Sequence, residues 1–184
     1  MGNKYSTSKK DFLKNEIWIL AWGGASQRAN IFPSKMGEKD RKAHREEIKK
    51  TVFRVFDQFE SLQKVSGELL IEKISYLVKK FSNRRISFNV GHSQKLINLM
   101  LKYYWCFGWL KNEPPHCPID RIILSKAKIK DDGKTPPWTK INSIKDYKRY
   151  IQELKKVAKP KSLAVWELES FNRNRVKSAK IVND

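Results

Sequence analysis

Hydrophobic residues recur at intervals of three or four positions along most of this chain, and no stretch alternates apolar and polar residues long enough to predict a β-strand. The clearest apolar stripe includes Val52, Phe56 and Phe59, and it predicts a long helix over residues 38–63. Hydrophobic residues make up 40% of the chain, which is enough to form a core. The sequence therefore predicts an all-α fold.

Further helices are expected wherever the same periodicity returns between glycine, proline and polar breaks. They cover residues 11–22, 66–81, 92–109, 118–123, 143–158 and 162–171. Gly23 and Gly24 are expected to end the first of them. No internal repeat or low-complexity tract divides the chain, so we expect one compact helical domain over residues 1–184, or two tightly packed helical lobes.

The charge of the chain indicates a polyanionic partner. Lys and Arg number 39 against 19 Asp and Glu, which gives a formal net charge of +20. Nucleic acid is the first candidate, and an anionic membrane surface is the second because no long helix pairs a basic face with a bulky apolar face. The N-terminus has no apolar secretory segment, although its Met-Gly start fits a short myristoylation pattern. We expect a cytoplasmic monomer without a membrane partner.

The segment ISFNVGHSQKLINLMLKYYWCFGWLKNEPPHCPIDRIIL, residues 86–124, differs from the rest of the chain. It begins with a glycine and a lysine four residues apart, continues as an apolar helix, and ends in Pro118-Ile119-Asp120 at the start of another helix. This order resembles the helix-hairpin-helix superfamily of DNA glycosylases, whose hairpin reads Gly-Val-Gly-x-Lys and precedes an apolar helix and a Val-Asp. Ser93 replaces the second hairpin glycine of that pattern.

The resemblance implies a helix-hairpin-helix element and an enzyme that extrudes and excises a base from double-stranded DNA. In that family the aspartate is catalytic, and in some members the lysine adds a strand-nicking lyase activity. The matching positions are Asp120 and Lys95. The residues that would contact DNA are Gly91, His92, Ser93, Gln94 and Arg121. The excised base could be damaged, as in repair, or modified, as in phage DNA carrying hypermodified cytosine.

The chemistry of these residue types agrees with those roles. A carboxylate near the sugar stabilises the positive charge that develops as the base leaves. Asp120 could serve in this way, or it could only cap the helix that follows it. Gly91 would let a DNA phosphate approach backbone N–H groups, or it could belong to an ordinary turn. Lys95 could attack C1′ of the sugar, contact a phosphate, or be a solvated surface residue.

Base extrusion also requires a side chain that stacks on the base or fills the gap it leaves. Most of the six tryptophans are expected in the core. Trp22 and Trp138 lie beside Gly23-Gly24 and Pro136-Pro137, so we expect them at loop edges, where one of them could form the base pocket or a wedge.

Two other functions remain open. Arg85 and His92 are separated by six residues, which resembles the Arg-x(4–6)-His motif of HEPN ribonucleases, and the same hairpin could belong to a DNA-binding module without catalysis. A metal site is not expected, because His92, Cys106, His116 and Cys117 match no standard zinc spacing. No cofactor is expected either.

Overall fold

A computed structural model describes residues 4–27, 29–82 and 85–181 of the chain. Within these ranges it contains α-helices, one short 3-10 helix (η1) and no strand, so the predicted all-α class is confirmed. In chain order the elements are α1 (Lys4–Ser26), α2 (Glu38–Leu62), α3 (Gly67–Phe81), α4 (Val90–Cys106), α5 (Arg121–Lys126), η1 (Trp138–Lys140), α6 (Ile144–Ala158) and α7 (Leu163–Ile181).

Polar side chains at the helix starts explain most of these boundaries. The hydroxyl of Ser66 accepts a hydrogen bond from the N–H of Leu69, and the hydroxyl of Ser143 accepts one from Asp146, so α3 and α6 begin close to where the sequence predicts. Helix α4 begins at Val90, two residues earlier than expected. The reason is a reciprocal pair of bonds between Asn89 and His92 that forms a capping box.

The expected end of the first helix is wrong. Helix α1 continues through Gly23 and Gly24 to Ser26. A Cβ atom on Gly24 would lie 2.8 Å from Cδ1 of Leu99, so this glycine permits α1 to approach α4 closely. The packing gained there offsets the low helix propensity of glycine, and Trp22 consequently lies inside a helix and not at a loop edge.

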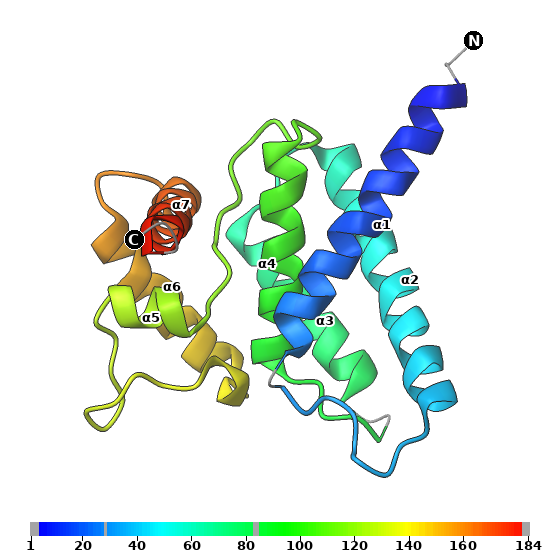
Figure 1. The fold of residues 1–184 in the computed structure, drawn as a ribbon, viewed down its shortest axis with the longest axis horizontal. Helices are drawn as coiled ribbons and strands as arrows, with labels where there is room; N and C mark the ends of the chain where they lie inside the picture. Colours follow the sequence, from blue (N-terminus) through cyan, green and yellow to red (C-terminus); the bar gives the residue numbers. More distant parts are fainter. Residues whose placement is uncertain (1–3, 28, 83–84, 182–184) are drawn as a thin grey trace.

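Helices α1 to α4 form one half of the molecule, and α5, η1, α6 and α7 form the other (Figure 1). The first half is closed by a large apolar core, to which α2 and α3 contribute the fully buried side chains of Phe56, Phe59, Leu70, Ile74 and Leu77. An extended segment after α4 carries the chain across to α5 (Figure 1). Helix α4 therefore borders both halves, and its second face meets α5 to α7.

Candidate functional site

Lys95 and Asp120 meet at the boundary between the two halves. Lys95 lies in the second turn of α4, and Asp120 is the residue immediately before α5. The Nζ atom of Lys95 is 3.8 Å from Oδ2 of Asp120 and 4.2 Å from the centroid of the Trp138 ring. Both charged side chains are mostly buried, at 13% and 28% exposed. An ammonium, a carboxylate and an indole from three separate segments thus share one site.

The site is a hollow of about 190 Å³ that opens to the surface. Its walls come from the end of α1, from α4, from the start of α5 and from η1. The residues that line it are Gly24, Gln27, Lys95, Asp120, Arg121, Ile122 and Trp138. Three predicted site residues, Lys95, Asp120 and Arg121, therefore lie together with Trp138, one of the two predicted aromatic residues. Gln27 was not predicted, and no sequence signal indicates it.

The two carboxylate oxygens of Asp120 have different partners. Oδ1 accepts a hydrogen bond of 3.0 Å from the backbone N–H of Ile123, which caps α5. Oδ2 faces Lys95. Since the cap fixes the side chain and leaves the second oxygen directed toward the hollow, capping and a chemical role are compatible in one residue.

Gln94 fixes Asp120 relative to Lys95. The amide nitrogen of Gln94 donates to the carbonyl oxygen of Ile119 at 2.8 Å, and its amide oxygen accepts from the N–H of Ile119 at 3.0 Å. Gln94 precedes Lys95, Ile119 precedes Asp120, and both Gln94 and Ile119 are completely buried. This two-bond clamp determines where the carboxylate lies with respect to the amine.

Gln94 is the first member of a buried polar row on α4. Asn98 and Lys102 follow at intervals of four residues, so all three share one face of the helix. The amide of Asn98 donates to the hydroxyl of Tyr147 at 3.1 Å, and that hydroxyl is 2.9 Å from Nδ1 of His116. The sequence shows this four-residue spacing, but it does not predict the hydrogen bonds, because the partners lie far along the chain.

Lys102 completes the row with a buried ion pair. Its ammonium lies 3.0 and 3.2 Å from the two carboxylate oxygens of Glu167 on α7. The side chains are only 10% and 5% exposed. Burial raises the pKa of Glu167, while the adjacent Lys102 opposes that shift. The three residues of the row thus connect α4 to the segment before α5, to α6 and to α7 in turn.

Trp138 is held in place by the first turn of α4. The N–H of Gly91 donates to the carbonyl oxygen of Ile141, and the amide of Asn89 donates to the carbonyl oxygen of Thr139, each at 2.8 Å. A Cβ atom on Gly91 would lie only 2.2 Å from the carbonyl oxygen of Trp138. Gly91 is therefore required for close approach of η1, a protein segment.

The other predicted DNA contacts in α4 also face protein. Gly91, His92, Ser93 and Gln94 all lie within the helix and are buried, and the hydroxyl of Ser93 donates to the carbonyl oxygen of Ile74. Burial lowers the pKa of His92 to about 4. These residues lie in α4 and not in a turn before it, so the helix-hairpin-helix element is not confirmed.

Arg121 differs from that group, since it is exposed and lines the hollow. Trp22 was expected at a loop edge, and that expectation is wrong. Its side chain is 8% exposed and stacks on Trp18, with 5.3 Å between the ring centroids. Trp138 is the aromatic residue that the structure places at the hollow.

The arginine and histidine of the ribonuclease motif do not share a surface. Arg85 is exposed in the connector before α4, whereas His92 is 1% exposed. In that family both side chains act on RNA, and the burial of His92 gives this alternative no support.

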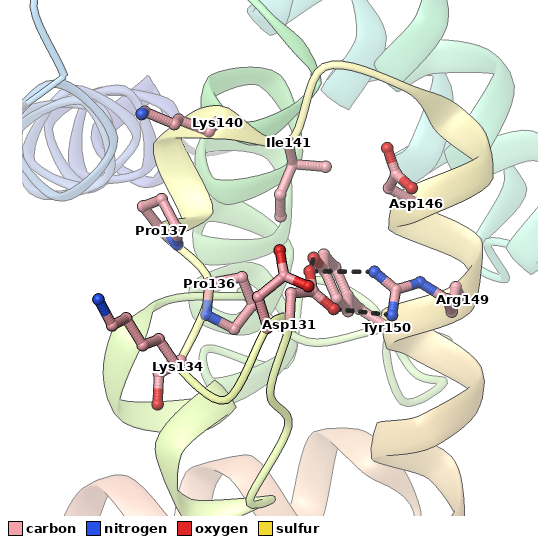
Figure 2. Close-up of a pocket in the computed structure, with 11 residues that line it drawn as sticks. Asp131, Lys134, Pro136, Pro137, Lys140, Ile141, Asp146, Arg149 and Tyr150 are labelled. Atoms are coloured by element: carbon pink, nitrogen blue, oxygen red, sulfur yellow. Dashed lines mark hydrogen bonds and ion pairs between the residues drawn. The ribbon is translucent and has the colours of Figure 1, made fainter.

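A second hollow, of about 340 Å³, lies between residues 131–141 and α6 (Figure 2). Asp131 enters it and is held by both guanidinium nitrogens of Arg149, at 3.0 and 3.1 Å, and by the hydroxyl of Tyr150 (Figure 2). These bonds from Arg149 and then Tyr150 lower the pKa of Asp131. The bonds of Asp131 to Arg149 and Tyr150 join the loop to α6, so this side of the hollow anchors the loop.

No family model, curated protein or solved structure matches this chain. Among the described residues, no helix is long and apolar enough to cross a membrane, and no three His, Cys, Asp or Glu side chains are grouped to hold a metal ion. The geometry around Lys95 and Asp120 is therefore the basis on which a function can be proposed.

Proposed function

We propose that this protein is a DNA glycosylase that extrudes a damaged or modified base and cleaves its N-glycosidic bond. The observation that carries the proposal is the pairing of Lys95 with Asp120 at 3.8 Å in an open hollow. These are the two residues that the resemblance to helix-hairpin-helix glycosylases assigns to catalysis. The large positive charge of the chain supports a DNA partner.

Asp120 has the features that cleavage of this bond needs. As the base departs, positive charge accumulates on the deoxyribose, and a preorganised carboxylate beside it lowers the energy of that transition state. The cap to Ile123 and the clamp from Gln94 hold the carboxylate before substrate arrives. The oxygen that faces the hollow is the one positioned to meet the sugar or an attacking water.

Lys95 supports one of two mechanisms. As a free amine it would attack C1′, displace the base and form a Schiff base with the opened sugar, which leads to strand nicking. As an ammonium it would pair with Asp120 and contact a phosphate, while water attacks the sugar. Trp138 offers an indole face beside both groups, on which an extruded base can stack.

The decisive variant for Asp120 is Asp120→Asn. Asparagine caps a helix about as well as aspartate, so α5 is kept and only the charge is removed. We expect base release to fall by about 10²–10³-fold or more, with DNA binding changed only a few fold. Asp11→Asn is the matched control, since Asp11 is exposed on α1 and lies outside the hollow. The assay screens DNA from phages with modified and unmodified bases, together with duplexes carrying single damaged bases.

Near-normal turnover by Asp120→Asn would reduce Asp120 to a helix cap and would overturn the proposal. DNA binding without release of any base in the screen would favour the alternative of a non-catalytic DNA-binding module.

Borohydride distinguishes the two mechanisms for Lys95. If the amine attacks, reduction traps a covalent protein–DNA adduct, and Lys95→Gln loses both the adduct and strand nicking. Lys42→Gln, which changes an exposed lysine of α2, is the matched control and keeps both. An active enzyme that leaves intact abasic sites and no adduct assigns the attack to water.

A further inference from the structure

We propose that the segment between α5 and α6 carries the phosphate-binding surface for DNA, through Lys128, Lys130, Lys134 and Lys140. The inference rests on the DNA partner of the proposed function, and it moves the backbone contacts away from the buried first turn of α4. It assigns to a loop the role that the sequence suggested for Gly91 to Gln94.

The four lysines are exposed, and no hydrogen bond or ion pair joins their side chains to another residue that the structure describes. The acidic residue next to them is already neutralised, because Asp131 is held by Arg149 on α6. Residues 128–140 contain four lysines and two aspartates, and Arg149 compensates the negative charge of one of the aspartates. A surplus of positive charge faces solvent.

The loop is fixed at both ends. At one end a tight turn is closed by two backbone bonds between Asp131 and Lys134, at 2.9 and 3.0 Å, with Asp132 and Gly133 at φ values of 49° and 75°. At the other end Ile141 accepts the hydrogen bond from Gly91. A surface held in this way loses little conformational entropy when it binds a ligand.

The position of Trp138 in this segment places the surface beside the candidate site. Lys134 and Lys140 both extend away from Arg149 and Asp146 (Figure 2). Trp138 lies between them in the chain and contacts Lys95. A DNA strand whose phosphates lie along the lysines would therefore pass the hollow that Asp120 lines.

The same segment lacks what a membrane surface would require. Its bulky aliphatic residues, Ile129 and Ile141, are 4% and 3% exposed, so no apolar side chain of that kind is available to enter a lipid interface. Cationic groups without an apolar anchor favour the phosphate backbone of a duplex.

The test compares two variants of equal charge. One replaces Lys128, Lys130, Lys134 and Lys140 with glutamine. The control replaces exposed lysines on or just after α2, on the far side of α1 and α4 from the loop (Figure 1), namely Lys39, Lys42, Lys50 and Lys64. Binding of each full-length protein to a fluorescent, undamaged 20-base-pair duplex is measured by anisotropy at several NaCl concentrations.

We expect the loop variant to lose at least about tenfold in affinity and to have a log–log salt slope shallower by about 2–4, because each lost phosphate contact removes about 0.9 from the slope. The control should keep the wild-type slope to within about one contact. Equal losses in both variants, or none in the loop variant, would overturn the inference.

Other outcomes separate this inference from the proposed function. Weaker binding of the loop variant to phosphatidylserine vesicles, with DNA binding unchanged, would assign the surface to a membrane and overturn the inference. Loss of the salt slope in the loop variant, in a protein that releases no base, would confirm the surface and refute the glycosylase. Normal base release together with an unchanged salt slope in the loop variant would support the glycosylase and refute the proposed surface. A wild-type protein that binds no duplex would overturn both.

Discussion

The two halves of this molecule are held together by different forces. Between α1, α2, α3 and α4 the contacts are mostly apolar, with aromatic and aliphatic side chains such as Phe56 and Leu70 fully buried. Between α4 and the second half, the row formed by Gln94, Asn98 and Lys102 makes buried polar bonds at each of its three positions. The hydrophobic effect is non-directional, whereas hydrogen bonds have preferred distances and angles and therefore define relative positions more closely.

This difference explains where the candidate site lies. Lys95 is adjacent to Gln94 on α4, and Asp120 is adjacent to the backbone that Gln94 holds. A pair of reactive groups supplied by two segments needs a boundary with defined geometry, and the polar row provides one. The apolar half supplies the stability that allows such a costly row to persist.

The largest expected effect comes from breaking the buried ion pair of the row. Lys102→Met leaves the carboxylate of Glu167 buried and without its partner, so we expect the free energy of unfolding to fall by about 3–5 kcal/mol. Lys161→Met is the control, because its pair with Glu169 is exposed and should contribute less than about 1 kcal/mol. Urea denaturation measures both.

The double variant Lys102→Met with Glu167→Leu should recover much of that loss, since no unpaired charge remains. Equal effects of Lys102→Met and Lys161→Met would mean that the boundary between the halves does not depend on the row.

Gln94→Leu should have the next largest effect. It leaves the N–H and the carbonyl of Ile119 buried without partners, which costs about 2–3 kcal/mol of stability. If the clamp positions Asp120, base release falls further, by about 10²-fold, even where the protein is fully folded. Gln58→Leu, at an exposed position of α2, is the control for both measurements.

Gln94→Glu separates positioning from simple destabilisation. A protonated carboxyl has one donor and one acceptor, which are the two that the clamp uses, so base release relative to wild type should improve as the pH is lowered. A ratio that does not vary with pH would show that the clamp has no such role.

Acid should destabilise the protein through two buried histidines, one on α4 and one at the boundary. Burial lowers the pKa of His92 and of His116 to about 4, whereas both titrate near 6.5 in the unfolded chain. The unfolded state then binds more protons below pH 6.5, so stability is lost as the pH falls from 6.5 toward 4. Each histidine should account for about 2 kcal/mol between pH 8 and pH 5.

The measurement is the free energy of unfolding as a function of pH, for wild type and for the variant with both His92→Gln and His116→Gln. The variant should lose most of the slope between pH 6.5 and pH 4.5. An unchanged slope would assign the acid sensitivity to other groups.

Sequence periodicity and capping residues were sufficient to predict the fold class and most helices. Ser66 and Ser143 act locally, so their effect on α3 and α6 can be read from the chain itself. Gly24 misled the prediction, because its packing on Leu99 is a contact between distant segments that outweighs local propensity.

The site was harder to predict for the same reason. The motif spacing pointed to Lys95 and Asp120, and the proline pair before Trp138 pointed to that tryptophan, all three of which line the hollow. The role of Gln94 could not be seen, because its partner is the backbone of Ile119, and backbone partners leave no trace in residue identity. A polar residue every fourth position in an apolar helix is the one signal that was present.

The smallest expected effects come from substitutions of two glycines. They test whether the boundary between the two halves depends on close backbone packing at η1. Gly91→Ala places a Cβ atom 2.2 Å from the carbonyl oxygen of Trp138, a backbone atom that cannot move without the whole of η1. We expect a loss of about 1–3 kcal/mol of stability from overpacking, only partly offset by the better helix propensity of alanine. Gly23→Ala, inside α1, meets nothing within 4 Å and should stabilise the protein by about 0.5–1 kcal/mol. The urea midpoints of the two variants should therefore move in opposite directions. If Gly91→Ala also stabilised the protein, η1 would be free to shift away from α4, and Trp138 would not be held over Lys95 as the candidate site requires.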